Sequence, residues 1–138
     1  MTTNYSEQLI KEYRFWDLQI HSNQGYLGRC VVMCRREDAQ DLTEATREEQ
    51  DELFLILRET KDALTKAFSP DWFNYAFLGN GLPRLHGHIV PRYKNPIVFK
   101  GTHFEDKLFG KHYRTDKSFV TPEKVLVEVR DEIGKYLK

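Results

Sequence analysis

One long amphipathic helix in the middle of the chain constrains the fold more than any other feature of the sequence. Thr46 and Glu49 form a capping-box pattern at its start, and Ser69-Pro70 ends it. Between these signals, apolar residues recur at helical spacing along one side: Leu53, Ile56, Leu57, Leu64, Ala67 and Phe68. The pattern predicts a helix over about residues 46–68. Its single apolar face needs a second layer to pack against.

The chain before this helix predicts one half of a β-sheet. Residues 14–21 and 29–35 are rich in β-forming residues, and the run 22–25 between them has turn chemistry. These features predict a hairpin. Residues 6–13 fit either a short helix or an arm.

The chain after the helix predicts the other half of the sheet. Residues 72–78 and 84–92 are expected to pair antiparallel across the turn Gly79-Asn80-Gly81. Residues 94–120 show no clean periodicity, and a connection of that length is usually functional or mobile. Thr121-Pro122 predicts an N-cap and first position of a helix that runs to the C-terminus. The fold class is therefore α+β: an antiparallel sheet, one long central helix and a C-terminal helix.

Composition limits the partners that the protein can have. The 138 residues fit a single domain over 1–138, and 21 basic residues balance 21 acidic ones, which argues against nucleic-acid binding. No apolar run is long enough to span a membrane, and Met1–Gln8 lacks the features of a signal peptide. Cys30 and Cys34 are expected to be reduced thiols, which indicates a cytoplasmic protein.

The strand predicted over residues 84–92 carries the clearest functional signal. Because strand side chains alternate between faces, Arg84, His86 and His88 share one side. Burying three such polar groups without partners is costly, and an anion site would explain that cost. A neutral imidazole can attack phosphorus and leave a phosphorus–nitrogen intermediate. The next imidazole, about 7 Å along the strand, can bond a phosphoryl oxygen.

The glycine-rich turn before this strand supplies further candidate donors. The side chain of Asn80 is a neutral hydrogen-bond donor. Gly79 and Gly81 let the backbone N–H groups approach an anion closely. Preorganised donors of this kind stabilise the charge that develops on phosphoryl oxygens.

The run His86-Gly87-His88-Ile89-Val90-Pro91-Arg92 resembles the signature of the histidine-triad (HIT) family of nucleotidyl hydrolases and transferases. The resemblance covers roughly residues 14–93 and implies a HIT-like antiparallel sheet of about five strands. It implies that His86 is the nucleophile and that His88 contacts the phosphate. At the first triad position this chain has Arg84. In the family, the first histidine supports the second through hydrogen bonding, and an arginine cannot accept a hydrogen bond. Either Arg84 contacts substrate phosphate, or the supporting role lies elsewhere.

The resemblance also implies the remaining site residues. Asn80, with Gly81 beside it, resembles the family's phosphate-contacting amide. The ribose-binding position falls on His21, or on Asn23 if the loop is shorter. The nucleobase usually lies in an apolar cleft formed by the first strands, for which the candidates are Phe15, Leu18 and Ile20.

The expected function is hydrolysis of a nucleotide through a nucleotidyl-His86 intermediate. The substrate would be a dinucleoside polyphosphate or a nucleoside phosphoramidate. No protein-bound cofactor or metal is required, although a polyphosphate would arrive with Mg²⁺. The resemblance implies a homodimer whose sheets meet edge to edge. Two alternatives remain: a catalytically silent nucleotide-binding module with Arg84 as its lesion, and a metal protein using His86 and His88 with His21 or His112.

Overall fold

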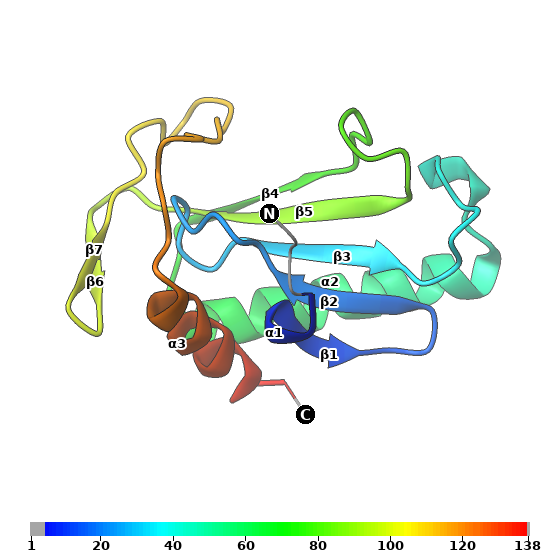
Figure 1. Ribbon diagram of the computed structural model, residues 1–138, viewed down its shortest axis with the longest axis horizontal. Coiled ribbons are helices and arrows are strands. Elements are labelled where there is room, and N and C mark those ends of the chain that lie inside the picture. The colour runs from blue at the N-terminus through cyan, green and yellow to red at the C-terminus, as the bar shows by residue number, and fades with distance from the viewer. Residues whose placement is uncertain (1–4, 138) are drawn as a thin grey trace.

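The computed structural model describes residues 5–137, which form a five-stranded sheet, a smaller two-stranded sheet and helices (Figure 1). Met1 to Asn4 and Lys138 lie outside the described residues. The expectation that Met1–Gln8 lacks a signal peptide therefore concerns a stretch whose first four residues lie outside the described residues. Within residues 5–137, no helix combines the length and apolar character needed to cross a membrane.

The main sheet is antiparallel throughout and has the strand order β1-β2-β3-β5-β4. Its strands are β1 (Leu9–Glu12), β2 (Trp16–Ile20), β3 (Cys30–Cys34), β4 (Trp72–Ala76) and β5 (His86–Arg92). The predicted pairings of β2 with β3 and of β4 with β5 are confirmed. β1 was not predicted as a strand. It is a short edge strand that follows the four-residue helix α1 (Tyr5–Gln8) and pairs irregularly with β2.

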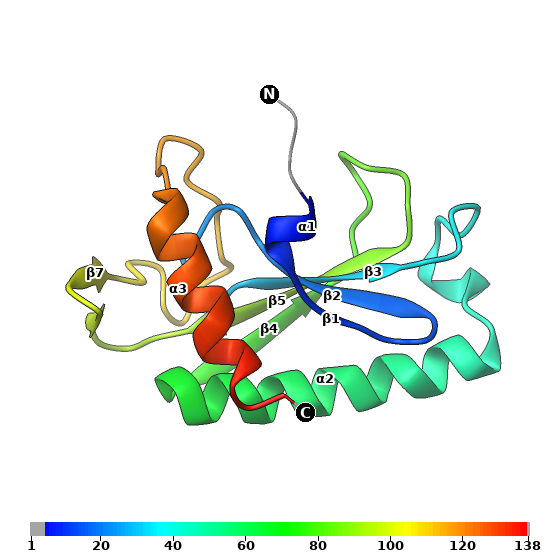
Figure 2. The ribbon, with the colours of Figure 1, turned by 60° about the horizontal axis from the view of Figure 1, so that its bottom comes forward.

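The long helix α2 (Arg47–Phe68) covers one face of the sheet, as the sequence predicted (Figure 2). Thr46 is its N-cap, and the reciprocal bonds of the capping box with Glu49 are both present. The helix ends at Ser69, whose backbone is left-handed with φ 51°. Four residues of the predicted stripe are buried and two, Leu57 and Ala67, are half-buried. The buried residues of α2 are Glu49, Leu53, Ile56, Thr60, Ala63, Leu64 and Phe68.

The register of β5 sets the position of the two histidines. β5 lies between β3 and β4, so that His86 is opposite Met33, and His88 is opposite Val31 on one side and Ala76 on the other. The alternate residue Gly87 faces the helix layer. A Cβ atom there would lie 2.4 Å from the ring of Phe77, so only glycine fits. The histidine face is therefore the face of the sheet that α2 leaves uncovered.

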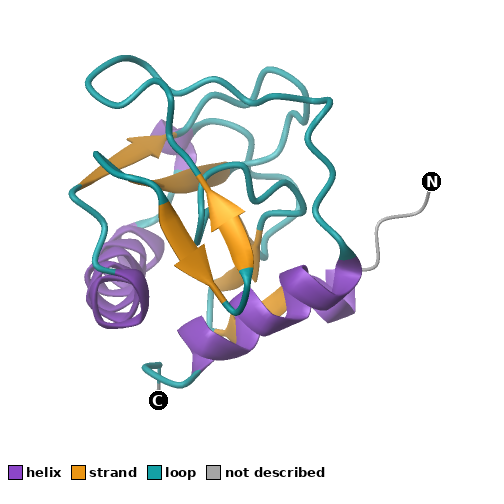
Figure 3. Cartoon of the chain, turned by 90° about the vertical axis from the view of Figure 1, so that its left-hand side faces the viewer, coloured by secondary structure: helices purple, strands orange, loops and turns teal. Residues whose placement is uncertain are grey.

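The remaining elements are a hairpin and a 3-10 helix that the sequence did not reveal, and the carboxyl-terminal helix that it predicted. β6 (Ile97–Phe99) and β7 (Thr102–Phe104) form a hairpin that is a separate two-stranded sheet and lies in front of the main sheet in Figure 3. α3 (Glu123–Gly134) packs against α1, α2 and β1. A short 3-10 helix, η1 (Leu42–Glu44), lies in the connection before α2.

The prediction of Thr121 as the N-cap of the last helix was wrong. Pro122 is the N-cap residue of α3 and makes no side-chain cap bond. The hydroxyl of Thr121 instead accepts a hydrogen bond from the backbone N–H of Gln24 at 2.8 Å. This long-range bond ties the start of α3 to the β2–β3 turn, and the local sequence pattern carries no sign of it. The helix also ends at Gly134, short of the C-terminus.

Candidate functional site

Three histidines converge on the uncovered face of the sheet. His86 and His88 come from β5, and their ring centroids are 5.3 Å apart. His21, directly after β2, places its ring centroid 5.6 Å from that of His88. His88 therefore lies between the other two rings, and all three side chains are half-buried.

The ring of His86 is oriented by the backbone. Its Nδ1 lies 2.6 Å from the carbonyl oxygen of Arg84. Since a carbonyl can only accept a hydrogen bond, Nδ1 carries the proton. The neutral ring of His86 therefore has its lone pair on Nε2, the nitrogen that is not bonded to the backbone.

His88 has the opposite arrangement of protons. Its Nδ1 lies 3.3 Å from Nη2 of the Arg29 guanidinium. A guanidinium can only donate, so Nδ1 is the acceptor and the neutral ring carries its proton on Nε2. Burial, followed by the positive charge of Arg29 and the coupling to the neighbouring His86 ring, lowers the pKa of His88 to about 4. His88 is therefore a neutral donor through Nε2 at physiological pH.

His21 is held in the same tautomer as His88. The backbone N–H of Asn23 donates to its Nδ1 at 3.0 Å, a shorter contact than the 3.3 Å from Nδ1 to the carbonyl oxygen of Asn23, and this shorter contact favours the proton on Nε2. Burial is the main cause that lowers the pKa of His21 to about 3, and the charges of Arg29 and His88 add to it. The side chain of Asn23 itself is used in the loop: its amide donates to the carbonyl of Asp116 at 2.9 Å.

Arg29 belongs to this site, and it was not among the site residues predicted from the sequence. Its side chain is 4 % exposed, and its Nη1 donates to the hydroxyl of Thr115 at 2.7 Å. Gly28, with φ +89°, makes the turn that leads into it. The available signal was an arginine at the entrance of the otherwise apolar run Cys30–Cys34.

The side chain of Arg84 does not join the three histidine rings of the site. Its Nη2 donates to the carbonyl oxygen of Cys34 at 2.9 Å and lies 3.4 Å from that of Arg35. Its guanidinium therefore lies at the end of β3. The contribution of residue 84 to His86 comes from its backbone carbonyl, which does not depend on the side chain.

Asn80 and Gly81 lie in the loop between β4 and β5, which rises on the side of the sheet away from α2 (Figure 2). Both residues are exposed. Within the described residues, the side chain of Asn80 makes no hydrogen bond to His86 or His88. The loop is thus on the side of the sheet that carries the imidazoles.

The apolar residues proposed for the nucleobase are not brought to the histidines. Leu18 and Ile20 are 0 % and 1 % exposed and belong to the core. Strand alternation puts both on the face covered by α2. Phe15 lies before the other end of β2, where its carbonyl accepts from the N–H of Arg35. The sequence did not show which residues of β2 share the face of the sheet that carries the histidines. In the structure these residues are Asp17 and Gln19.

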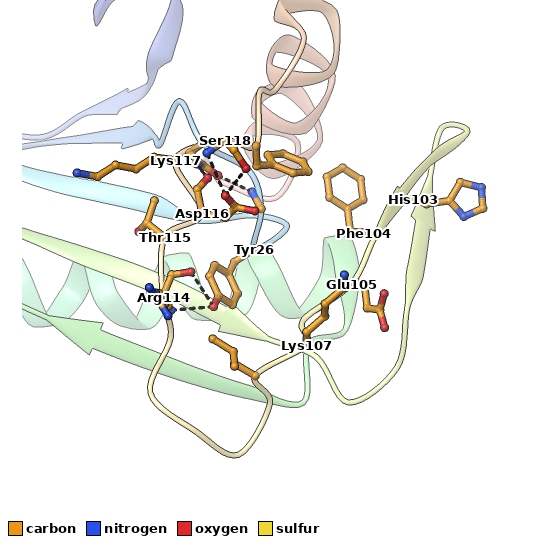
Figure 4. A pocket seen from close by; sticks show the side chains of 14 residues that line it. Tyr26, His103, Phe104, Glu105, Lys107, Arg114, Thr115, Asp116, Lys117 and Ser118 are labelled. Carbon is orange, nitrogen blue, oxygen red and sulfur yellow. Dashed lines mark hydrogen bonds between the residues drawn. The ribbon is translucent and has the colours of Figure 1, made fainter.

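A cavity of about 940 Å³ lies next to the site, among loops of the carboxyl-terminal third (Figure 4). Its wall includes Asn23, Tyr26, Phe104 and residues 114–119, but neither His86 nor His88. The hydroxyl of Tyr26 bonds both the N–H and the carbonyl of Arg114, at 2.9 Å and 3.2 Å. The segment around residue 114 is thereby fixed beside Arg29.

The metal-protein alternative named His86 and His88 with His21 or His112 as ligands. Among residues 5–137, no group of three or more His, Cys, Asp or Glu side chains is placed to hold a metal ion. His112, suggested as a distant ligand, is exposed, and its Nδ1 lies 2.6 Å from the carbonyl of Tyr113. The buried cation Arg29 beside His88 also disfavours a second cation.

Several solved structures share the fold of this chain. The chain is similar to a histidine triad protein from Bradyrhizobium japonicum, with 17% identity, TM-score 0.74 and coverage of 100% of this chain and 97% of that one. A histidine triad protein from Marinobacter aquaeolei is 20% identical, with TM-score 0.70 and coverage of 96% and 91%. A Plasmodium falciparum diadenosine triphosphate hydrolase, solved with cyclomarin A, is 12% identical, with TM-score 0.68 and coverage of 95% and 76%.

Comparison of the sequence with family models gives the same result. The model of the HIT domain matches residues 20–95, which is more than half of the chain and includes β3, α2, β4 and β5. No curated protein sequence matches the chain closely enough to extend the comparison. With the fold, the histidine strand and the family model in agreement, the chain belongs to the HIT-domain family.

Proposed function

We propose that the protein is a nucleotidyl hydrolase or transferase that cleaves the bond at the α-phosphorus of a nucleotide through His86. The observation that carries the proposal is the 2.6 Å bond between Nδ1 of His86 and the carbonyl of Arg84. This bond leaves the lone pair on Nε2 and orients it, as nucleophilic catalysis by an imidazole requires. The family, and the fold shared with a diadenosine triphosphate hydrolase, support the same reaction class.

The proposed reaction has two displacement steps. In the first, the Nε2 lone pair of His86 forms a bond to the α-phosphorus, and the bond to the leaving group breaks with its electron pair. The ring then carries a positive charge, which the carbonyl of Arg84 stabilises through Nδ1–H. In the second step, water attacks the phosphorus and releases a proton to the solvent, and the phosphorus–nitrogen bond breaks with its electron pair returning to Nε2, so that a mononucleotide is released. His86 returns to its starting state.

The neutral state of His88 bears on the substrate. A ring with a pKa of about 4 donates a hydrogen bond to a phosphoryl oxygen through Nε2–H, but it holds no extra proton for a leaving group. A polyphosphate leaves without needing that proton, whereas the amine of a phosphoramidate needs one. Of the two expected substrates, the dinucleoside polyphosphate is therefore favoured, with diadenosine triphosphate as the first compound to test.

The test is hydrolysis combined with detection of the adduct. Wild-type protein incubated with diadenosine triphosphate and Mg²⁺ should release AMP, and rapid quenching should show the mass of an adenylyl group on the protein. H86A should lose both signals, with a loss in rate of at least about 10³-fold. H103A changes an exposed histidine in β7 and should behave as the wild type. Hydrolysis by H86A at the wild-type rate would disprove the assignment.

A catalytically silent module is the second candidate, and one observation favours it. The Arg84 guanidinium contacts carbonyls of β3, so the first triad position brings no imidazole to the site. Binding of AMP by calorimetry, without adduct or hydrolysis for any adenylated compound, would select this function. Turnover by the wild type would exclude it.

The proposal includes a homodimer formed through β4. This strand lies at the edge of the sheet, and its side chains Trp72 and Tyr75 are 66% and 43% exposed. An exposed strand edge with large apolar side chains is a ready surface for pairing with a second copy. Light scattering should give twice the chain mass. A W72E/Y75K variant should give a monomer.

A further inference from the structure

We propose that Arg29 is a positioning residue that holds His88 in a single tautomer, with Nε2–H available to the ligand. The catalytic consequence rests on the proposed function, whereas the effect on the ring does not. Nη2 of Arg29 lies 3.3 Å from Nδ1 of His88, so the guanidinium occupies the nitrogen that would otherwise compete for the proton.

Arg29 is itself held in place from a separate part of the chain. Its Nη1 donates to the hydroxyl of Thr115 at 2.7 Å, and its guanidinium lies 5.3 Å from the ring centroid of Tyr113. Both contacts come from the segment between β7 and α3. Tyr26 fixes that segment through its two bonds to the backbone of Arg114. The orientation of His88 thus depends on a segment that follows the HIT-domain match at residues 20–95.

The surroundings of Arg29 do not explain it as a structural ion pair. It is buried, yet no carboxylate within the described residues forms a salt bridge with it, and its Nε has no hydrogen-bond partner. Burial lowers the pKa of Arg29, which reflects the cost of keeping the charge there. A buried charge with this cost and no counterion points to a role at the site.

The titratable groups near His88 all act in the same direction. Arg29 and His86 both disfavour a charged His88, and His21 on the other side is itself disfavoured as a cation by His88. From the segment between β7 and α3, Tyr113 contacts the guanidinium of Arg29. None of these groups is a carboxylate that would stabilise an imidazolium. The neighbourhood therefore keeps the His88 ring neutral, and Arg29 decides which nitrogen carries its proton.

This assignment gives two adjacent imidazoles complementary chemistry. His86 offers a lone pair on Nε2, and His88 offers a proton on Nε2. If His88 adopted the other tautomer, its Nε2 lone pair would face a phosphoryl oxygen and repel it. The transition state would then lose one hydrogen-bond donor.

The test measures the His88 ring directly. Long-range proton–nitrogen NMR on ¹⁵N-histidine protein reports the tautomer and the pKa of each ring without a substrate. The wild type should show His88 neutral with the proton on Nε2 from pH 8 down to pH 5. R29M removes the donor and the charge, so the His88 spectrum should become a mixture of tautomers and its pKa should rise. R58M, an exposed arginine on α2, is the matched control and should leave the ring unchanged.

Kinetics then separates this inference from the proposed function. With diadenosine triphosphate, R29M should lower kcat by about tenfold or more and change KM less, because the lost donor acts mainly in the transition state. If the wild type has no activity but R29M changes the His88 tautomer, the proposed function fails and the role of Arg29 stands. If R29M leaves the tautomer and the pKa of His88 as in the wild type, the role of Arg29 is refuted.

A second pair of variants covers the case in which R29M does not fold. R29K keeps a cation but loses the planar donor pair, so the pKa of His88 should stay low while the tautomers mix. T115V removes only the acceptor of Nη1 and should shift His88 in the same sense as R29M by a smaller amount. An unchanged His88 tautomer in both variants would overturn the proposal.

Discussion

Two buried arginines, Arg92 and Arg29, have almost the same exposure and opposite surroundings. Arg92, at the end of β5, is 3% exposed, and both its Nε and Nη2 donate to the carboxylate of Asp106. Its Nη1 bonds the side chain of Asn74 and the carbonyl of Lys111, and its Nη2 also bonds the carbonyl of Leu108. Arg29 is 4% exposed and has one hydroxyl, one imidazole and an unpartnered Nε.

The difference shows what each charge does in the molecule. Arg92 is neutralised and its bonds join the segment 106–111 to the sheet, as a structural charge must be when it is buried. Arg29 has no counterion among residues 5–137 and lies beside two rings whose pKa values are lowered. Burial alone therefore does not distinguish an anchor from a site residue; the presence or absence of a carboxylate does.

The largest effect is expected when Arg92, the buried arginine that joins the segment 106–111 to the sheet, is replaced. R92M leaves Asp106 buried without its partner and removes the bonds to Leu108 and Lys111. We expect a loss of about 3–5 kcal/mol in the free energy of unfolding, measured by urea denaturation. The double variant R92M/D106L removes both charges and should recover part of the loss. A single variant within 1 kcal/mol of the wild type would contradict the anchor role.

The lowered pKa values of two site histidines predict an effect of pH on stability that is smaller than the effect of R92M. His21 and His88 have pKa values of about 3 and about 4 in the folded protein, against about 6.5 when unfolded. Because the folded pKa values are depressed, the contribution of the two neutral rings to the free energy of unfolding is complete above pH 6.5 and is lost as the pH falls toward 4. Allowing for the exposure of both rings, the loss between pH 6.5 and pH 5 should be about 1–2 kcal/mol.

Urea denaturation at a series of pH values measures this loss. H21N keeps an oxygen that can accept the bond from the Asn23 N–H, but it removes one titrating ring. The variant should therefore have a shallower dependence on pH than the wild type. An equal dependence in both proteins would show that His21 does not titrate as the geometry implies.

Strong local signals in the sequence were sufficient to predict the main architecture. The capping box and apolar stripe gave the limits of α2, and turn residues gave the two antiparallel pairs, because these patterns act over a few residues. β1 and the β6–β7 hairpin are strands of three or four residues, too short for alternation to reveal them. The role of Thr121 depends on a contact with Gln24, which is distant in sequence.

The site was predictable where one strand carries it and not where several segments meet. Alternation placed His86 and His88 together, since both lie on β5. In β2 the same rule could not choose between faces without knowing which side α2 covers, and so Leu18 was proposed although it belongs to the core. Arg29 was missed because its meaning comes from His88 and Thr115, which are brought to it only by the fold.

The smallest expected effect completes the comparison of the two arginines. R29M removes a buried charge that has no carboxylate partner, so the loss of its hydrogen bond to Thr115 is offset by the desolvation cost that disappears. We expect the free energy of unfolding at pH 7 to stay within about 1 kcal/mol of the wild type, in the same urea experiment that shows a large loss for R92M. If R29M loses as much stability as R92M, Arg29 is a structural residue and the contrast between the two sites is not real. A stable R29M protein with an altered His88 ring would show instead that the fold retains an unneutralised charge for the sake of the site.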